Sequence, residues 1–137
     1  MESIDLQLPL YTAVSAACLM LIQVVLMFSV IKSRGDLSIF IGHGDNSMLE
    51  RKIRAHGNFI ENVPTFLIGL LLLELMIGSG LWVLVLGAVV AVARLSHAIA
   101  LMANSGVTAG RLIGTLGTVI PTVVTAGYLI LLAVGKF

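Results

Sequence analysis

The stretch that decides the fold covers residues 50–77 and reads ERKIRAHGNFIENVPTFLIGLLLLELMI. It opens with a cluster of charged and polar residues and closes with a long apolar run. Such a run predicts a membrane-spanning helix, because backbone polar groups inside lipid must be satisfied within the segment itself. Ionisable groups at the entrance of a membrane helix are energetically expensive. We therefore expect the polar residues of this stretch to have a function.

The composition extends this interpretation to the whole chain. Of the 137 residues, 58% are hydrophobic and 11% are charged, and the mean hydropathy is +1.09. A soluble domain carries about 25% charged residues, so the sequence predicts an all-α integral membrane protein with a single domain over residues 1–137. The net charge of +1 gives no indication of nucleic-acid binding. Cys18 is the only cysteine, which excludes an internal disulfide.

Four apolar segments approach the ~20 residues that a membrane helix needs. The tight turn at residues 78–80, Gly-Ser-Gly, makes the second and third segments an antiparallel hairpin. Residues 32–46 form the longest connection and are expected to be the mobile loop, and residues 47–50 fit a capping box at the start of the second helix. The prediction is an antiparallel, up-down bundle of four transmembrane helices, at about residues 9–31, 48–77, 81–103 and 111–135.

The basic residues of the chain gather at two of the three connections. Cytoplasmic loops of membrane proteins carry an excess of Lys and Arg. The first and third connections are therefore predicted to lie in the cytoplasm, and both termini outside. The residues behind this assignment are Lys32, Arg34, Arg51, Lys52 and Arg54 at the first connection and Arg111 at the third.

Helical spacing brings three polar residues of the second segment onto one face. Arg54, Asn58 and Glu61 lie four and three residues apart. In the third segment Arg94 and His97 are neighbours by the same rule, at a depth similar to that of Glu61. We expect an ion pair between Glu61 and Arg94, because neither charge is tolerable alone against lipid. Such a pair also has a purely structural interpretation, in which it fixes the register of the two helices.

Polar residues from several segments accumulate in the cytoplasmic half of the predicted bundle. Several cations around a small polar cavity suit an anionic ligand with carboxylates, which arginine forks match well. No metal-binding spacing is visible, and no metal is predicted. Glu74 stands apart near the outer end of the second helix and is expected to face water or a subunit contact. The predicted binding residues are Arg51, Arg54, His56, Asn58, Glu61, Arg94 and His97, with Arg111 near them.

Residues 50–61, ERKIRAHGNFIE, resemble the second-helix signature of the MAPEG family, the membrane-associated proteins in eicosanoid and glutathione metabolism. Arg94-x-x-His97 is similar to a second patch of that family, and the resemblance covers nearly the whole chain. It implies a left-handed four-helix bundle that assembles as a homotrimer, with active sites between subunits that open to the cytoplasm. The chain looks closest to bacterial members, which implies a bacterial inner membrane.

The resemblance also implies a function. Family members that are enzymes bind glutathione and activate its thiol, and they either add glutathione to a lipophilic substrate or use it to isomerise one. Glutathione would then be a co-substrate that contacts Arg54, Asn58 and Glu61. Arg111 would match the arginine that stabilises the thiolate, a role that a cation performs by lowering the thiol pKa from about 8.5. The implied function is that of a membrane-bound glutathione-dependent transferase or peroxidase-like protein acting on hydrophobic electrophiles.

The chain departs from the prostaglandin and leukotriene synthases of the family at two tyrosines. Apolar residues around Leu101 replace the first, and Thr115 stands near the second, so eicosanoid synthesis is not expected. One alternative is a non-catalytic protein of the same fold that binds an anionic amphiphile or lipid. Another, a four-helix multidrug transporter, needs a carboxylate in the first helix, where this chain has only Gln23. The expected partners are membrane lipids, further copies of the chain and a hydrophobic small molecule, without nucleic acid.

Overall fold

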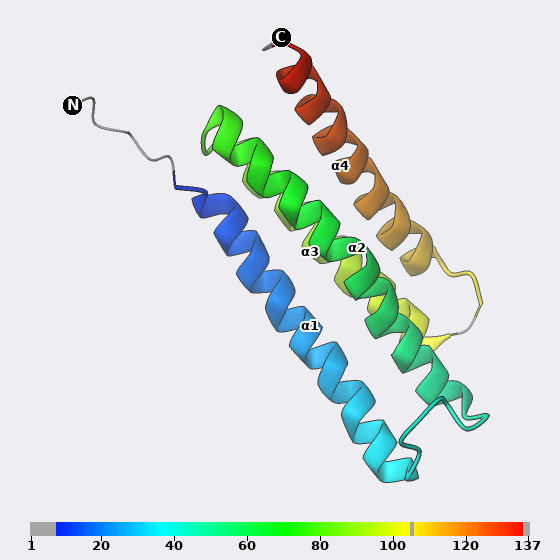
Figure 1. Cartoon of the computed structure of the whole chain (residues 1–137). Helices are drawn as coiled ribbons and strands as arrows, with labels where there is room; N and C mark the ends of the chain where they lie inside the picture. Colours follow the sequence, from blue (N-terminus) through cyan, green and yellow to red (C-terminus); the bar gives the residue numbers. More distant parts are fainter. Residues whose placement is uncertain (1–7, 105, 136–137) are drawn as a thin grey trace.

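The computed structural model describes residues 8–104 and 106–135, which form four long helices (Figure 1). All four are long and apolar enough to cross a membrane, which confirms the predicted four-helix membrane bundle. Among the described residues there is no β-strand. The helices are α1 (Leu10–Leu37), α2 (Ser47–Ile77), α3 (Leu81–Ala103) and α4 (Ala109–Val134).

The first helix, α1, continues beyond its predicted end near residue 31. It ends where Ser38 adopts a φ of 55°. The Ser38 N–H donates to the Gly35 carbonyl at 3.2 Å, and the Ile39 N–H donates to the Arg34 carbonyl at 3.1 Å. These bonds satisfy carbonyl oxygens that the helix end leaves without donor partners. The apolar run alone underestimates the helix, because charged residues that lie outside the hydrocarbon are still good helix formers.

Side-chain caps set the starts of α2 and α4. Asn46 Oδ1 accepts a hydrogen bond from the Leu49 N–H at 2.9 Å, so this asparagine caps α2 in place of the predicted serine that follows it. Thr108 Oγ1 accepts from the Arg111 N–H at 3.4 Å, and α4 begins at Ala109, slightly earlier than predicted. Short polar side chains at these positions satisfy N–H groups that lack intrahelical acceptors.

The helices α2 and α3 form the centre of the bundle, with α1 on one side and α4 on the other (Figure 1). Within the described residues α3 contacts all three other helices, whereas α1 and α4 do not contact each other. The α1–α2 and α3–α4 connections lie at one end of the bundle, here called the loop end. The turn between α2 and α3 lies at the opposite end, the turn end. The chain termini, residues 1–7 and 136–137, are outside the described part.

Apolar side chains between the helices form two clusters, one in each half of the bundle. Many large apolar residues on the outer faces of the helices are exposed, as the hydrocarbon of a bilayer requires. The buried apolar side chains therefore hold the helices together, while the exposed ones are suited to contact with lipid. The loop-end cluster contains Leu19, Leu26, Ala55, Phe59, Val63, Ala98 and Leu101, and the turn-end cluster contains Phe66, Leu70, Val83 and Val90.

Glu74 is buried at the turn end, where its carboxylate caps the start of α1. Its Oε1 accepts hydrogen bonds from the Tyr11 N–H at 3.1 Å and from the Ser79 hydroxyl at 2.6 Å. Its Oε2 accepts from the Thr12 N–H at 2.7 Å. A carboxylate at a helix N-terminus satisfies free N–H groups and complements the helix dipole. The side chain is only 1% exposed, so the expectation that Glu74 faces water or a subunit contact is wrong.

Glycines bring α4 close to α3. A Cβ atom at Gly114 would lie 2.7 Å from the Ala93 carbonyl oxygen, and one at Gly117 would lie 2.7 Å from the Ala93 Cβ. A Cβ at Gly110 would lie 2.9 Å from the Cβ of Ala100. These separations leave no room for a side chain, so the small residues of α4 serve close helix packing.

Candidate functional site

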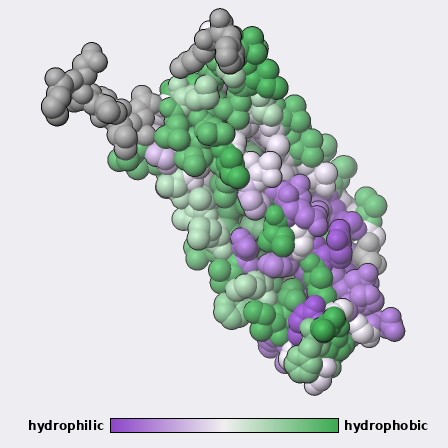
Figure 2. Space-filling model, viewed as in Figure 1, coloured by the Kyte–Doolittle hydropathy of each residue, from purple (hydrophilic) through white to green (hydrophobic). Residues whose placement is uncertain are grey.

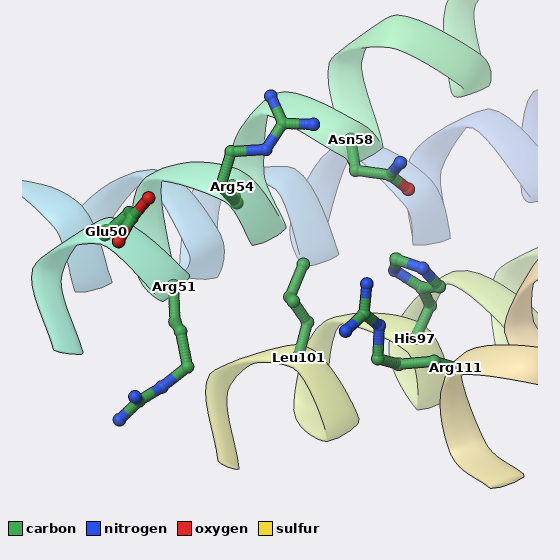
Figure 3. A pocket seen from close by; sticks show the side chains of 7 residues that line it. All are labelled: Glu50, Arg51, Arg54, Asn58, His97, Leu101 and Arg111. Atoms are coloured by element: carbon green, nitrogen blue, oxygen red, sulfur yellow. The ribbon is translucent and has the colours of Figure 1, made fainter. Parts of the chain in front are cut away.

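A cavity of about 250 Å³ opens near the loop end between α2, α3 and α4 (Figure 3). We call it the basic cavity. Figure 2 shows hydrophilic residues gathered on this part of the molecule, bounded by hydrophobic surface. Three of its α2 residues are spaced four apart, so one helix face supplies most of the wall. The basic cavity is lined by Glu50, Arg51, Arg54, Asn58, His97, Leu101 and Arg111.

Arg94 lies directly behind this wall and holds Asn58 in place. Its side chain is 3% exposed, and its Nη1 donates to Asn58 Oδ1 at 2.6 Å. Its Nη2 donates to the carbonyl oxygen of Gly114 in α4 at 2.7 Å. A guanidinium carries only donors, so the Asn58 atom that faces it must be the oxygen. The Asn58 amide nitrogen, which has no partner among the described residues, is thereby kept as a donor at the cavity wall.

The predicted ion pair between Glu61 and Arg94 is wrong. Both terminal nitrogens of Arg94 have other acceptors, Asn58 from α2 and Gly114 from α4. Glu61 is exposed on the surface of α2, and among the described residues it forms no ion pair with Arg94. Asn58 precedes Glu61 by one turn on the same face, and the register of α2 against α3 brings Asn58 to the guanidinium. The arginine is therefore buried beside neutral oxygens and has no carboxylate partner in the described part of the chain.

Two lining arginines also connect the elements around the basic cavity. Arg51 Nε donates to the carbonyl oxygen of Met102 in the last turn of α3 at 3.2 Å. Arg111 Nη1 donates to the Gly106 carbonyl in the α3–α4 connection at 2.8 Å. In Figure 3 the Arg111 side chain reaches from α4 to a position beside His97, whereas Arg51 extends away from that group. Of the two, Arg111 is better placed to contact a ligand next to His97.

His56 is a predicted binding residue that lies outside this arrangement. It is not part of the cavity lining, and its Nε2 is buried without a hydrogen-bond partner among the described residues. It shares a helix face with Lys52, four residues earlier, whose Nζ donates to Ser33 Oγ of α1 at 2.6 Å. This face turns toward α1, which explains why His56 and Asn58, although close in sequence, lie on different sides of α2.

The lining contains two residues that were not singled out as binding residues. Glu50 precedes Arg54 by four residues, and Leu101 follows His97 by four residues. The same helical spacing that linked Arg54 to Asn58 could have identified both. Asn62, which is not part of the lining, contacts the backbone of a lining residue: its Nδ2 donates to the backbone oxygen of Asn58 at 2.7 Å.

The basic cavity is chemically suited to bind an anion. Arg54 and Arg111 supply positive charge, and Glu50 is the only carboxylate among the described lining residues. Guanidinium groups bind carboxylates through two parallel hydrogen bonds, and the Asn58 amide adds a neutral donor. Within the described residues, no group of three His, Cys, Asp or Glu side chains could hold a metal ion. The arrangement can hold a carboxylate-bearing ligand and place a cation beside it.

Comparison with known proteins identifies a family and two similar membrane proteins. The sequence profile described as "MAPEG family" matches residues 11–131. The chain is similar to inner membrane protein YecN of Escherichia coli strain K12 and to the protein of the same name in E. coli O6:H1 strain CFT073. Each is 34% identical over 89 residues, which is 64% of this chain and 64% of the relative. The match thus spans just under two thirds of these relatives, and no solved structure matches significantly.

Proposed function

Because the chain belongs to the MAPEG family, we propose that it is a membrane-bound glutathione-dependent transferase or peroxidase-like protein that acts on hydrophobic electrophiles. The observation that carries this proposal is the basic cavity with Arg94 behind it. A buried guanidinium without a carboxylate partner favours an anionic ligand nearby. Glutathione has two carboxylates and a thiol, and it can satisfy the free donors of Arg54 and Asn58 together.

Arg111 is the group that we propose to activate the thiol. Its guanidinium lies beside His97 at the wall of the basic cavity (Figure 3). A cation next to sulfur stabilises the thiolate and increases the fraction of the nucleophilic form. The thiol proton passes to water in the cavity, the thiolate sulfur forms a bond to the electrophilic carbon, and the leaving group departs with the electrons of its bond. The lipophilic substrate reaches the sulfur from the hydrocarbon side of the bundle.

The test of glutathione binding exploits the orientation of the Asn58 amide. The Asn58→Asp variant keeps an oxygen against Arg94 and strengthens that contact by charge, so the bundle is expected to fold. The cavity-facing donor, however, becomes an acceptor. Calorimetry on purified protein is expected to show glutathione binding to the wild type, and binding weakened by about tenfold or more in Asn58→Asp, since a hydrogen bond to a charged group is worth roughly 1.5–3 kcal/mol.

The control for this test is Asn104→Asp, which adds the same charge at the loop end outside the cavity lining and keeps the oxygen that accepts from the Gly106 N–H. Its glutathione affinity should stay within a few-fold of wild type. Equal affinity of Asn58→Asp and wild type would contradict the proposed binding role of Asn58. Absence of any glutathione binding to the wild type would contradict the function itself. With Arg111→Ala, conjugation and the ultraviolet absorbance of the bound thiolate should both fall.

We also propose that three copies of the chain assemble, with the polar face of α2 covered in the assembly. Arg54 and Glu61 are exposed on α2, which is apolar enough to span a membrane. Charges that face lipid are costly, so a neighbouring polar surface is expected to cover them. Light scattering of the protein in detergent measures the mass of the assembly, and a monomeric particle would argue against this arrangement.

The proposed location is a bacterial inner membrane, in agreement with the name of the E. coli relatives. In the proposed orientation the loop end faces the cytoplasm, because the basic residues Arg34 and Arg111 lie there. The basic cavity would then open near the cytoplasmic surface, where a water-soluble peptide such as glutathione can enter.

A further inference from the structure

The connection between α1 and α2 presents two adjacent apolar side chains to the outside. Phe40 is 80% exposed and Ile41 is 92% exposed. We call this pair the apolar tip. Single apolar residues scattered over a surface are ordinary, whereas contiguous apolar patches indicate contact with a protein or a membrane. We infer that the apolar tip inserts into the headgroup region of the protein's own bilayer and anchors the loop end of the bundle there.

The connection has a folded shape that keeps the apolar tip outside. Arg34 Nη1 donates to the carbonyl oxygens of the two residues that flank the tip, Ile39 at 3.1 Å and Gly42 at 3.0 Å. Ile39 packs within the connection, since a Cβ atom at Gly44 would lie 2.8 Å from its Cδ1. Gly42 and Gly44 have φ of 68° and 55°, a left-handed conformation that glycine adopts without steric cost. The tip can therefore lose contact with water only against something outside the connection.

The position of the apolar tip along the bundle matches the headgroup region. The apolar part of α1 ends at Ile31, and Lys32 is the first charged residue after it. Arg34 lies about 4.5 Å beyond Ile31 at a rise of 1.5 Å per residue. The headgroup region occupies roughly 5–8 Å on each side of the hydrocarbon. Since the Ile39 N–H and the Gly42 carbonyl both bond Arg34, the connection folds back onto this turn of α1 and holds the tip near the same depth.

The distribution of aromatic residues favours the bilayer as the partner of the tip. Trp and Tyr are enriched at both interfaces of membrane proteins, where they act as anchors. In this chain the one Trp and both Tyr lie at the turn end: Tyr11 begins α1, and Trp82 and Tyr128 have ring centroids 5.7 Å apart. The loop-end connections contain neither Trp nor Tyr, and their single Phe is Phe40. The apolar tip therefore supplies at the loop end the anchor that three aromatic rings supply at the turn end.

An anchor at this depth also places the entrance of the basic cavity. Lys52 Nζ donates to Ser33 Oγ, which brings this turn of α2 level with the turn of α1 that holds the tip. Arg51, the neighbour of Lys52, belongs to the lining of the basic cavity. The tip thus keeps that lining at the boundary between water and hydrocarbon. The inference adds this to the proposed function and does not depend on glutathione binding.

The experiment uses a bimane probe on full-length protein in phosphatidylcholine nanodiscs, in a Cys18→Ser background that removes the native cysteine. Ile41→Cys puts the probe on the apolar tip and keeps Phe40. Phosphatidylcholine with a nitroxide on its headgroup should quench this probe several-fold more strongly than aqueous iodide does, because the tip lies among headgroups.

Ser47→Cys provides the matched control position. Ser47 is exposed at the start of α2, five residues before Lys52. At a rise of 1.5 Å per residue it lies about 7.5 Å farther from the bilayer centre than Lys52, which is outside the headgroup region. Its probe should show the opposite preference, with iodide quenching several-fold stronger than quenching by the nitroxide lipid.

A second pair of variants tests the apolar character of the tip. Phe40→Ser in the Ile41→Cys protein removes half of the tip and leaves both bonds of Arg34, which end on backbone oxygens of other residues. Quenching by the nitroxide lipid should fall several-fold, while the thermal midpoint in detergent should stay unchanged because Phe40 is exposed. Phe40→Leu keeps an apolar side chain and should keep the quenching.

Three results would overturn the inference. The first is the same quenching preference at Ile41→Cys and Ser47→Cys. The second is unchanged quenching by the nitroxide lipid in Phe40→Ser. The third is protection of the Ile41→Cys probe from both quenchers, because a second copy of the chain would then cover the tip in place of lipid.

Discussion

At the scale of single residues, two buried charges organise the molecule, one in each half of the bundle. Arg94 joins α2, α3 and α4 at the wall of the basic cavity through Asn58 and Gly114. Glu74 joins the end of α2 to the start of α1. Both carboxylate oxygens of Glu74 accept hydrogen bonds, whereas Arg94 uses its two terminal nitrogens and its buried Nε has no partner among the described residues. A buried charge is tolerated when its hydrogen bonds are satisfied, which holds for Glu74 and only in part for Arg94.

Glu74→Gln is expected to lower stability. The amide keeps the size of the side chain but replaces one acceptor by a donor, which then faces an N–H at the start of α1 or the Ser79 hydroxyl of the α2–α3 turn. Leaving buried groups unpaired costs about 1–3 kcal/mol, so the thermal midpoint in detergent should fall clearly. Glu50→Gln serves as a control, because Glu50 is exposed in the first turn of α2. A midpoint of Glu74→Gln equal to wild type would show that the cap contributes nothing.

At the scale of elements, the contact of α3 with α4 positions the site. Gly114 lies against His97 and Ala93, and its carbonyl oxygen accepts from both Arg94 and Thr118. The absence of a side chain at this glycine therefore serves two purposes, since it allows the close approach and leaves the carbonyl within reach of the guanidinium. Packing and ligand binding are coupled at this residue.

Gly114→Ala tests that coupling. The added Cβ would meet the Ala93 oxygen at 2.7 Å and the His97 Cα at 2.9 Å, so α4 must move away. Overpacking of this kind costs about 1–3 kcal/mol, and glutathione affinity should fall as the Arg94 contact is disturbed. Gly127→Ala on the same helix has open space and should be neutral or slightly stabilising, because alanine favours a helix. Equal stability of the two variants in thermal unfolding would refute the argument.

At the scale of the whole molecule, the topology puts both basic connections at the loop end. Ile41 in the first connection and Val107 in the third are 92% and 91% exposed, and Leu81 at the turn end is 68% exposed. Ile41 and Val107 are therefore accessible at the loop end of the bundle, and Leu81 is accessible at the turn end. Their accessibility in a living cell reports how the bundle is oriented in its membrane.

The proposed orientation predicts which of these positions a membrane-impermeant maleimide reaches. In a Cys18→Ser background, the Leu81→Cys variant should react in intact bacterial cells. The Ile41→Cys and Val107→Cys variants should react only after the membrane is broken, because the positive-inside rule puts their end in the cytoplasm. The opposite pattern of labelling would reverse the proposed orientation.

Helix spacing explains which residues of the site could be predicted from the sequence and which contacts could not. It put Arg54 and Asn58 on one face of α2 and Arg94 beside His97 on α3, and the structure brings these residues together around one cavity. Spacing along one helix cannot say which of two polar residues, Asn58 or Glu61, meets a partner on another helix. That choice depends on the rotation and register of α2 against α3, which many apolar contacts determine together.

The sequence by itself determined the four membrane helices, because long apolar runs leave the backbone only helical structure inside lipid. It also determined that the polar residues gather near one end of the bundle. Only the tertiary structure decided that Arg94 binds Asn58 and that Glu74 caps α1. These contacts join residues far apart in the chain, and their formation depends on how the helices pack, which no local pattern encodes.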